Sequence, residues 1–319
     1  MARCLRRRRC FLMNRVDPDL RVNLAGIELS TPVLAASGPF GYGHEYLERI
    51  DSSALSAVIV KGISTEPWAG NPPPRLAETP AGLLNSIGLQ NPGLQAFLAE
   101  DLPRLKNYSP KLIVNVVGKT VEEYAKVAAA LKQSEGVDGL ELNISCPNLK
   151  AGGMAFGTCP EATFEVVSLV RKVTDLPLLI KLSPNVTDIT VIARAAEEAG
   201  ADGLSLVNTL SGMAIDIESK KPLLGNTFGG LSGPAIMPVA LKMVWQAAGA
   251  VNIPLLGMGG ITSAEDAIQF MLAGASAVAL GTGLFYDPEL PQQVQEGLVH
   301  YMSAHKLTNI GQLVGLARR

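Results

Sequence analysis

Eight short runs of apolar and β-branched residues recur along the chain, each bounded by glycine, proline or polar residues. They are PVLAAS (32–37), AVIVKG (57–62), LIVNVVG (112–118), GLELNIS (139–145), LLIKLS (178–183), GLSLVNT (203–209), PLLGMGG (254–260) and SAVALGTG (276–283). Near-continuous apolar runs of this length are typical of strands buried on both faces of a parallel sheet. The chain is therefore expected to belong to the α/β class.

Amphipathic segments with helical spacing separate these runs. Examples are residues 120–133, 160–173, 188–200 and 263–275. Eight strand–helix units in one chain predict a closed (β/α)8 TIM barrel, a fold that typically takes ~250 residues. An open doubly wound sheet is the competing fold, but no G-x-G-x-x-G sequence follows the first run, as a dinucleotide-binding sheet of that type would require.

Two connections, at about 63–111 and 210–253, are too long to be simple crossovers. Loops of this length inside a compact domain are usually functional. They follow the second and sixth predicted strands, so in a barrel they would lie at the carboxyl ends of the strands, where active sites form. We predict one barrel domain over residues 14–319, with long inserted loops after strands 2 and 6 that act as lids.

The start of the chain, MARCLRRRRCFLM (1–13), is strongly basic, whereas the whole chain has a formal net charge of −2. The apolar stretch after the arginines is too short for a signal peptide or a membrane span. A polybasic tail for a membrane or nucleic acid is one interpretation, and an over-long start with Met13 as the true beginning is another. We expect residues 1–13 to be a disordered extension, and we expect no nucleic-acid or membrane partner.

Four cysteines occur, Cys4, Cys10, Cys146 and Cys159, and none forms a C-x-x-C pair. Iron–sulfur and zinc sites normally use such close spacing, so no metal site is predicted. No secretion signal is recognisable, so we expect a cytoplasmic protein, in whose reducing compartment a disulfide between Cys146 and Cys159 is disfavoured. Cys159 is instead expected to begin a helix or to fill space.

Polar side chains end, or nearly end, the first six predicted strands. They are Ser37, Lys61, Asn115, Asn143, Lys181 and Asn208. Barrel enzymes build their sites at this rim from several strands at once, whereas capping or internal pairing would be the structural alternative. Glu141 shares the parity of Asn143 along its strand, so we expect it to point into the barrel and pair with a lysine.

The last two predicted strands end in glycine turns, which contain Gly259, Gly260, Gly281 and Thr282. Backbone amides at these two strand ends, with Thr262 or Ser263 as a helix cap, are typical of the phosphate-binding corner of barrels. In the second insert, Gly233 and Pro234 precede another helix, and their segment is expected to face the same phosphate.

Lys181 lies in an otherwise apolar strand, where an ammonium is costly to bury unless an anion or an electron-rich ring meets it. A Schiff-base lysine and a donor to a cofactor that gains negative charge are both open interpretations. The histidines, His44, His300 and His305, do not lie at a strand end beside Cys146. A Cys–His nucleophilic pair is therefore not expected, and Cys146 is the candidate for moving a proton.

Several of these stretches together resemble the class 1 dihydroorotate dehydrogenases, FMN-dependent barrels of pyrimidine biosynthesis. The motifs are NSIGLQNPG (85–93), NISCPN (143–148), VNT (207–209), GMGGI (257–261) and GTG (281–283). The resemblance covers about residues 20–305 in the family's order. The stretch 70–93 is most similar to class 1B, whose catalytic subunit works with an electron-transfer subunit.

The resemblance implies oxidation of (S)-dihydroorotate to orotate in de novo UMP synthesis. Cys146 would remove the C5 proton while hydride passes from C6 to FMN; serine takes this place in class 2. The residues implied for the substrate are Lys61, Asn85, Ser86, Ile87, Gly88, Leu89, Asn143, Asn148, Asn208 and Thr209. The residues implied for FMN are Ser37, Lys61, Gly62, Asn115, Asn143, Lys181 and Val207, with the phosphate at Gly233, Gly259, Gly260, Gly281 and Thr282. The glycine-rich segment 148–160 would be a gate.

The resemblance also implies a partner subunit that carries FAD and a [2Fe-2S] cluster, in a heterotetramer of two catalytic and two electron-transfer chains. This chain has neither a second dinucleotide motif nor iron–sulfur cysteines, so the electrons would reach NAD only through such a partner. The alternatives are a class 1A enzyme that reduces fumarate, a Schiff-base aldolase that uses Lys181, and a barrel that only binds a ligand.

Overall fold

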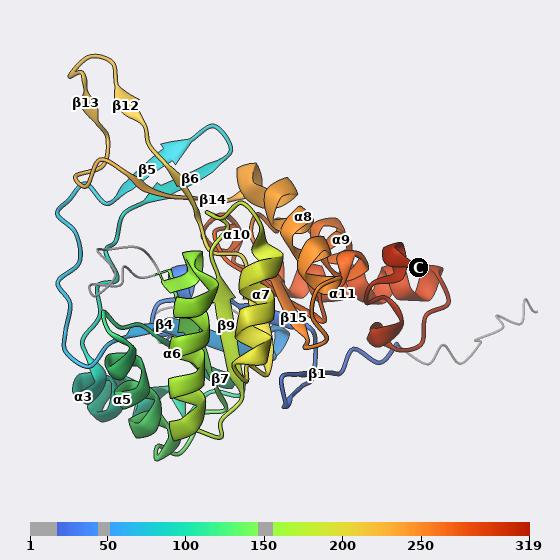
Figure 1. Ribbon diagram of the computed structural model, residues 1–319. Helices are drawn as coiled ribbons and strands as arrows, with labels where there is room; N and C mark the ends of the chain where they lie inside the picture. Colours follow the sequence, from blue (N-terminus) through green and yellow to red (C-terminus); the bar gives the residue numbers. More distant parts are fainter. Residues whose placement is uncertain (1–17, 44–51, 146–155) are drawn as a thin grey trace, which may run out of the picture.

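The computed structural model describes residues 18–43, 52–145 and 156–319, and it contains a closed barrel of eight parallel strands (Figure 1). The barrel strands are β3 (Val33–Ala35), β4 (Ala57–Ile63), β7 (Lys111–Val116), β8 (Gly139–Asn143), β9 (Leu178–Leu182), β10 (Gly203–Leu206), β15 (Leu255–Met258) and β16 (Ala277–Leu280). They neighbour one another in chain order, and β16 closes the barrel against β3. Each strand overlaps one of the eight predicted runs, so the TIM-barrel prediction is confirmed.

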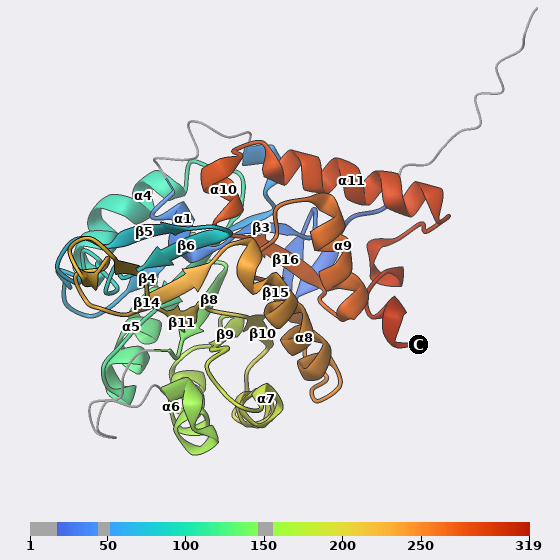
Figure 2. The ribbon, with the colours of Figure 1, turned by 90° about the horizontal axis from the view of Figure 1, so that it is seen from above.

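Helices surround the barrel on its outside (Figure 2). The longer ones are α5 (Val121–Lys132), α6 (Pro160–Val173), α7 (Ile189–Glu198), α8 (Met237–Ala248), α9 (Ala264–Ala273) and α11 (Leu290–Ala304). The short ones are α1 (Ser37–Phe40), α3 (Leu94–Ala96), α4 (Leu102–Leu105) and α10 (Gly283–Tyr286). Three of the four predicted helices begin at capping side chains: Thr120 before α5, Asp188 before α7 and Ser263 before α9. Cys159 precedes α6 directly, as expected.

A hairpin of β1 (Val22–Leu24) and β2 (Ile27–Leu29) closes the amino end of the barrel. A Cβ placed on Gly139, the first residue of β8, would lie 2.8 Å from Cδ1 of Ile27. Leu24, Ile27 and Leu29 belong to the same buried cluster as inward-facing barrel residues such as Leu179. Because this end is filled with apolar side chains, a polar site must lie at the carboxyl end.

The two inserts combine into one antiparallel sheet, with the strand order β11-β14-β6-β5. Its strands are β5 (Leu76–Thr79), β6 (Gly82–Asn85), β11 (Leu210–Gly212) and β14 (Gly229–Ser232), and a hairpin of β12 (Ile215–Asp216) and β13 (Lys221–Pro222) projects beyond it (Figure 1). The inserts were predicted in the right places, but as loops. The strands within them were not predicted: β14 pairs with β6 across about 145 residues of chain.

Within the described residues, no helix has both the length and the apolar character needed to cross a membrane.

Candidate active site at the carboxyl rim of the barrel

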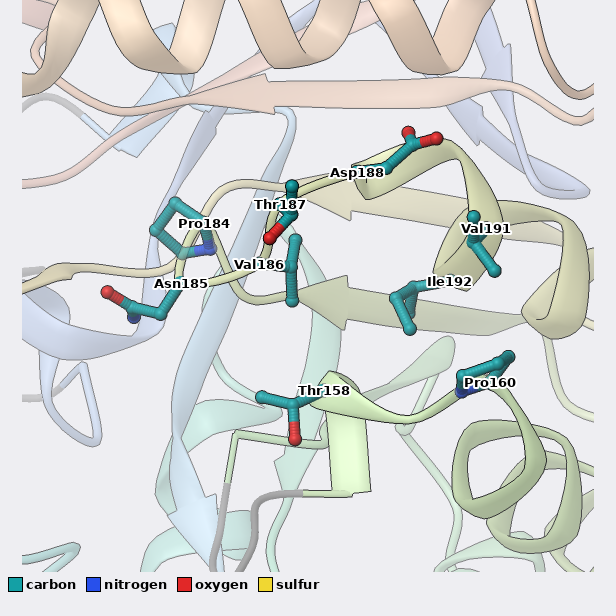
Figure 3. Close-up of a pocket in the computed structure, with 9 residues that line it drawn as sticks. All are labelled: Thr158, Pro160, Pro184, Asn185, Val186, Thr187, Asp188, Val191 and Ile192. Carbon is teal, nitrogen blue, oxygen red and sulfur yellow. The ribbon is translucent and has the colours of Figure 1, made fainter.

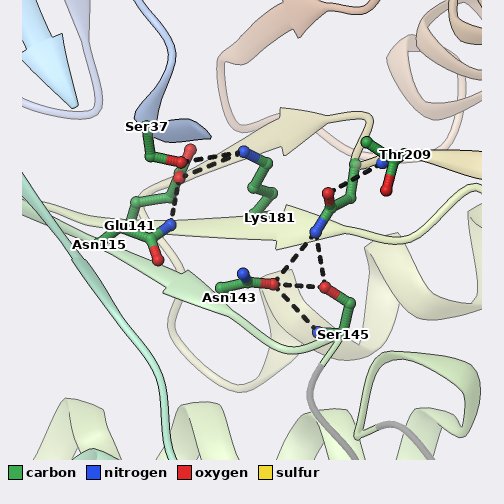
Figure 4. Close-up of polar contacts among 8 residues, drawn as sticks. Ser37, Asn115, Glu141, Asn143, Ser145, Lys181 and Thr209 are labelled. Carbon is green, nitrogen blue, oxygen red and sulfur yellow. Dashed lines mark hydrogen bonds and ion pairs between the residues drawn. The ribbon is translucent and has the colours of Figure 1, made fainter. Parts of the chain in front are cut away.

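A buried ion pair joins the neighbouring strands β8 and β9 inside the barrel. Nζ of Lys181 lies 3.8 Å from Oε2 of Glu141, whose side chain is fully buried. The same carboxylate oxygen accepts a 2.6 Å hydrogen bond from Nδ2 of Asn115 in β7, and the lysine also donates to Oγ of Ser37 at 3.4 Å (Figure 4). The predicted pairing of Glu141 with a lysine is confirmed. An ammonium and an amide are thus fixed inside the barrel mouth.

A second polar cluster joins the ends of β8 and β10. Oδ1 of Asn143 accepts hydrogen bonds from Nδ2 of Asn208 at 3.2 Å and from the backbone N–H and hydroxyl of Ser145. Nδ2 of Asn208 also donates to Oγ of Ser145 at 2.6 Å (Figure 4). The hydroxyl of Tyr124 donates to the Asn143 carbonyl at 2.7 Å. Two predicted substrate residues, Asn143 and Asn208, are therefore adjacent.

Cys146 and Asn148 lie outside the described residues, so the predicted base and one predicted substrate residue stay predictions. Ser145 is the described residue immediately before Cys146.

Lys61 and Gly62 occupy an irregularity in β4, where the register with β7 shifts between Val60 and Ile63. A Cβ on Gly62 would lie only 2.9 Å from Oδ1 of Asn115. Glycine at position 62 therefore lets the Asn115 side chain lie close to the backbone of β4. The structure brings Gly62 and Asn115, both predicted FMN residues, into contact.

The predicted substrate segment 85–89 begins at the last residue of β6 in the insert sheet and continues as a loop. Nδ2 of Asn85 donates to the Gly230 carbonyl at 3.2 Å, and Oγ of Ser86 accepts from Nδ2 of Asn71 at 2.8 Å. Gly88 has φ +73°, and a Cβ there would overlap Asn71. Asn71, which sequence reasoning missed, therefore fixes the shape of this segment from two sides, because its backbone N–H also donates to Ile87.

Thr209 links this segment to the rim of the barrel. Its side chain lies so close to the Gly230 backbone that a Cβ there would overlap it, and Gly230 pairs with Asn85. The neighbouring backbone is also fixed, because the N–H of Val207 donates to Met258 in β15 at 3.0 Å and that of Asn208 donates to Leu182 in β9 at 2.9 Å.

The predicted phosphate corner is assembled from three separate parts of the chain. A Cβ on Gly260 (φ +83°) would lie 2.8 Å from the Gly233 carbonyl oxygen, and one on Gly233 (φ +95°) would lie 3.7 Å from Cγ2 of Thr282. Oγ1 of Thr282 donates to Oγ of Ser232 at 2.8 Å. The turns after β15 and β16 and the second insert therefore meet, as the sequence predicts. Gly259 (φ +123°) completes the turn after β15.

Tyr42 is a titratable side chain just after α1. Burial raises its pKa far above the ordinary value, and the nearby charge of Asp101 raises it further. Within the described part of the chain, its buried hydroxyl has no hydrogen-bond partner. Tyr42 thus stays protonated at neutral pH and is not a candidate base.

Asn185 is a rim residue that sequence reasoning missed. Its Nδ2 donates to the Thr209 carbonyl at 3.0 Å, and its Oδ1 accepts from the Ser211 backbone N–H at 2.9 Å. It thereby ties the loop after β9 to the second insert. Its place two residues after the fifth apolar run was the signal that the sequence offered.

A cavity of about 640 Å³ opens beside Asn185, between the starts of α6 and α7 (Figure 3). It is lined by Thr158, Pro160, Pro184, Asn185, Val186, Thr187, Asp188, Val191 and Ile192. The predicted site residues that the structure describes are not among its lining residues. The cavity is therefore separate from the polar groups inside the barrel mouth.

A family model and the sequences of known proteins both identify the family to which this chain belongs. A family model described as dihydroorotate dehydrogenase matches residues 19–302. The catalytic subunit of dihydroorotate dehydrogenase B (NAD(+)) from Citrifermentans bemidjiense is 54% identical over 298 residues, 93% of this chain and 98% of the relative. The protein of the same name from Alkaliphilus metalliredigens is 54% identical over 297 residues, with the same coverage of 93% and 98%.

A solved structure supports the fold. The crystal structure of DHODH in complex with ferulenol from Eimeria tenella superposes with a TM-score of 0.78 and covers 96% of this chain and 90% of its own. At 24% sequence identity, this likeness concerns the fold alone.

Proposed function

Because the chain belongs to the dihydroorotate dehydrogenase family, we propose that it is the catalytic subunit of an NAD-linked enzyme that oxidises (S)-dihydroorotate to orotate in UMP synthesis. The 54% identity to relatives named as such subunits supports this activity. The geometric observation that carries the proposal is the contact of Asn143 with Asn208 at the barrel mouth, directly before the segment that contains Cys146.

We propose FMN as the cofactor, and the described residues fit it. Lys181 supplies a buried ammonium and Asn115 a buried amide, donors that suit the polar edge of a flavin. Beside Gly281 there is room for a ligand, because the atoms nearest to a Cβ placed there are 3.9 Å away. The residues that would hold FMN are Ser37, Lys61, Gly62, Asn115, Asn143, Lys181 and Val207, with its phosphate at Gly233, Gly259, Gly260, Gly281 and Thr282. Bound FMN would accept a hydride at N5 and release two electrons to the next carrier.

The substrate ring would be held mainly by amides. Each asparagine offers both a donor and an acceptor, which suits a ring of alternating N–H and C=O groups. Oδ1 of Asn143 is engaged by Asn208 and Ser145, whereas its Nδ2 makes no hydrogen bond to another described residue and is placed to donate. We propose that Lys61, Asn148, Thr209 and the segment 85–89 complete the substrate site.

In this proposal Cys146, as thiolate, takes the proton from C5 of dihydroorotate. The C6–H bond breaks with its electron pair, which leaves as hydride, and a C5=C6 double bond forms. A thiolate is the basic form of cysteine, and an ordinary thiol with a pKa of about 8.5 is only partly ionised at neutral pH. The enzyme therefore needs Cys146 deprotonated at the start of each turnover.

The two electrons must then reach NAD. The words "catalytic subunit" in the relatives' names support a second subunit. We propose that this subunit carries FAD and a [2Fe-2S] cluster, in an assembly with two copies of each chain. The balanced reaction is dihydroorotate plus NAD+ to orotate, NADH and a proton.

The test compares electron acceptors. The FMN-loaded chain is assayed with dihydroorotate and either NAD or fumarate, alone and with the electron-transfer chain. We expect NAD reduction only with that chain present. Turnover with fumarate by the isolated chain would overturn the NAD-linked assignment, and turnover with neither acceptor in the complete complex would overturn the proposed activity.

A further inference from the structure

Glu141 is a fully buried carboxylate whose position depends on two polar neighbours. Its Oε2 accepts a 2.6 Å hydrogen bond from Nδ2 of Asn115 and lies 3.8 Å from Nζ of Lys181. The glutamate side chain is 0% exposed and the lysine side chain 8%. A charge so far from water must be balanced within the protein.

One oxygen of Glu141 thereby fixes two side chains on neighbouring strands. Asn115 reaches it from β7 and Lys181 from β9, while Oγ of Ser37 accepts a second contact from the lysine, a hydrogen bond of 3.4 Å (Figure 4). The ammonium of Lys181 is therefore held by both a carboxylate and a hydroxyl. Both Asn115 and Lys181 are residues that would contact the flavin.

The other oxygen of Glu141 argues against a purely structural role. Oε1 is buried and has no hydrogen-bond partner among the residues that the structure describes. Ser205 pairs with Lys181 in the β9–β10 register, and its Oγ is likewise buried without a hydrogen-bond partner among the described residues. A carboxylate kept only for stability would be expected to have both oxygens satisfied, and a buried ion pair often adds little net stability.

We propose that Glu141 is a positioning residue that orients Lys181 and Asn115 toward the flavin and sets the reduction potential of the site. This rests on the proposed function. A flavin gains negative charge when it accepts a hydride, and Lys181 favours that charge while Glu141 opposes it. The carboxylate thus limits how strongly the site retains electrons that must pass to the next carrier.

The first test replaces the carboxylate by an amide of the same shape, Glu141→Gln. The midpoint potential of bound FMN, measured against reference dyes, is expected to shift to a more positive value. Glu141→Asp keeps the charge, so its potential should lie between those of the wild type and Glu141→Gln. Glu135→Gln removes a carboxylate whose side chain is 96% exposed and should leave the potential unchanged. An unchanged potential in Glu141→Gln, with lowered thermal stability, would overturn the proposal in favour of a structural role.

The second test needs no cofactor. Thermal unfolding of the FMN-free chain is compared for Glu141→Gln, Lys181→Met and the double variant. Each single change leaves one buried group without its partner, so both should lower the Tm, and the double variant should recover part of the loss. Additive losses would overturn the pairing on which the inference rests.

The two tests separate the inference from the proposed function. A wild-type chain that does not bind FMN contradicts the proposed function, whatever the stability cycle gives. A wild-type chain that binds FMN, with no potential shift in Glu141→Gln, contradicts only the role of Glu141.

Discussion

Asn208, just beyond the end of β10, donates a hydrogen bond of 3.2 Å from its side-chain amide to Oδ1 of Asn143, the last residue of β8. The two residues are 65 positions apart in the chain, and β9 lies between their strands. The contact therefore holds the ends of β8 and β10 together at the barrel mouth. It also engages Oδ1 of Asn143, whose Nδ2 makes no hydrogen bond to another described residue.

Removing this amide should weaken substrate binding. In Asn208→Ala, the loss of a half-buried hydrogen-bonding group is expected to cost about 1–3 kcal/mol, or roughly a 5- to 150-fold rise in the Kd for dihydroorotate. The measurement is a titration of the FMN-loaded chain with orotate or dihydroorotate. Asn107→Ala is the matched control, because Asn107 is exposed and its side chain only bonds its own helix. Equal affinities in the two variants would contradict the role of Asn208.

Gly233 should be required for the phosphate corner. Its φ of +95° is strained for any side chain, and a Cβ would lie 2.7 Å from Cα of Gly82. Gly233→Ala is expected to weaken FMN binding at least about tenfold, since a backbone shift of this kind costs on the order of 1–3 kcal/mol. Gly200→Ala controls for strain, because Gly200 has φ +98° and follows α7 at its carboxyl end. It should lower the Tm without loss of FMN. The same loss of FMN in both variants would contradict a specific phosphate site.

Asp188 should make stability depend on pH. The hydroxyl and then the backbone N–H of Thr190 donate to its carboxylate and lower its pKa below the ordinary 3.8. The folded pKa is lower than the unfolded one, so the stabilisation is present above pH 3.8 and is lost as the pH falls through the folded pKa. Urea midpoints of the wild type and Asp188→Asn, measured from neutral to acidic pH, should converge at the acid end. A difference that persists at the lowest pH would show that the charge is not responsible.

Cys146→Ser should separate catalysis from cofactor binding. A serine hydroxyl is a far weaker base than a thiolate, so flavin reduction by dihydroorotate should slow by roughly 10²–10⁴-fold, the range typical of a lost general base. The protein should stay yellow. In the wild type, the reduction rate should rise toward alkaline pH with one apparent ionisation. A colourless variant, or a rate in the wild type that is flat between acidic and alkaline pH, would count against Cys146 as the base.

The sequence was sufficient to predict the barrel because its strands are near-continuous apolar runs, such as LLIKLS in β9. The pairing of Glu141 with a lysine also followed, because side-chain direction alternates along a strand. The structure identifies that lysine as Lys181. The insert strands were missed for a physical reason. Strands such as β14, GGLS, are short and glycine-rich, and they are defined by pairing with a distant segment rather than by their own pattern.

Contacts made by loop residues were also not predicted from the sequence. Asn71 and Asn185 each hold a backbone segment that has no periodicity, so their partners cannot be read from spacing. The roles of Cys146 and Asn148 stay predictions, because both lie outside the described residues.

The most direct test of the central claim is a single-turnover experiment. The FMN-loaded chain, without a partner and without oxygen, is mixed with (S)-dihydroorotate while the visible absorbance of the flavin is followed. We expect bleaching of the flavin and formation of one orotate per FMN. A chain that binds FMN but keeps its absorbance unchanged, with no orotate formed, would contradict it.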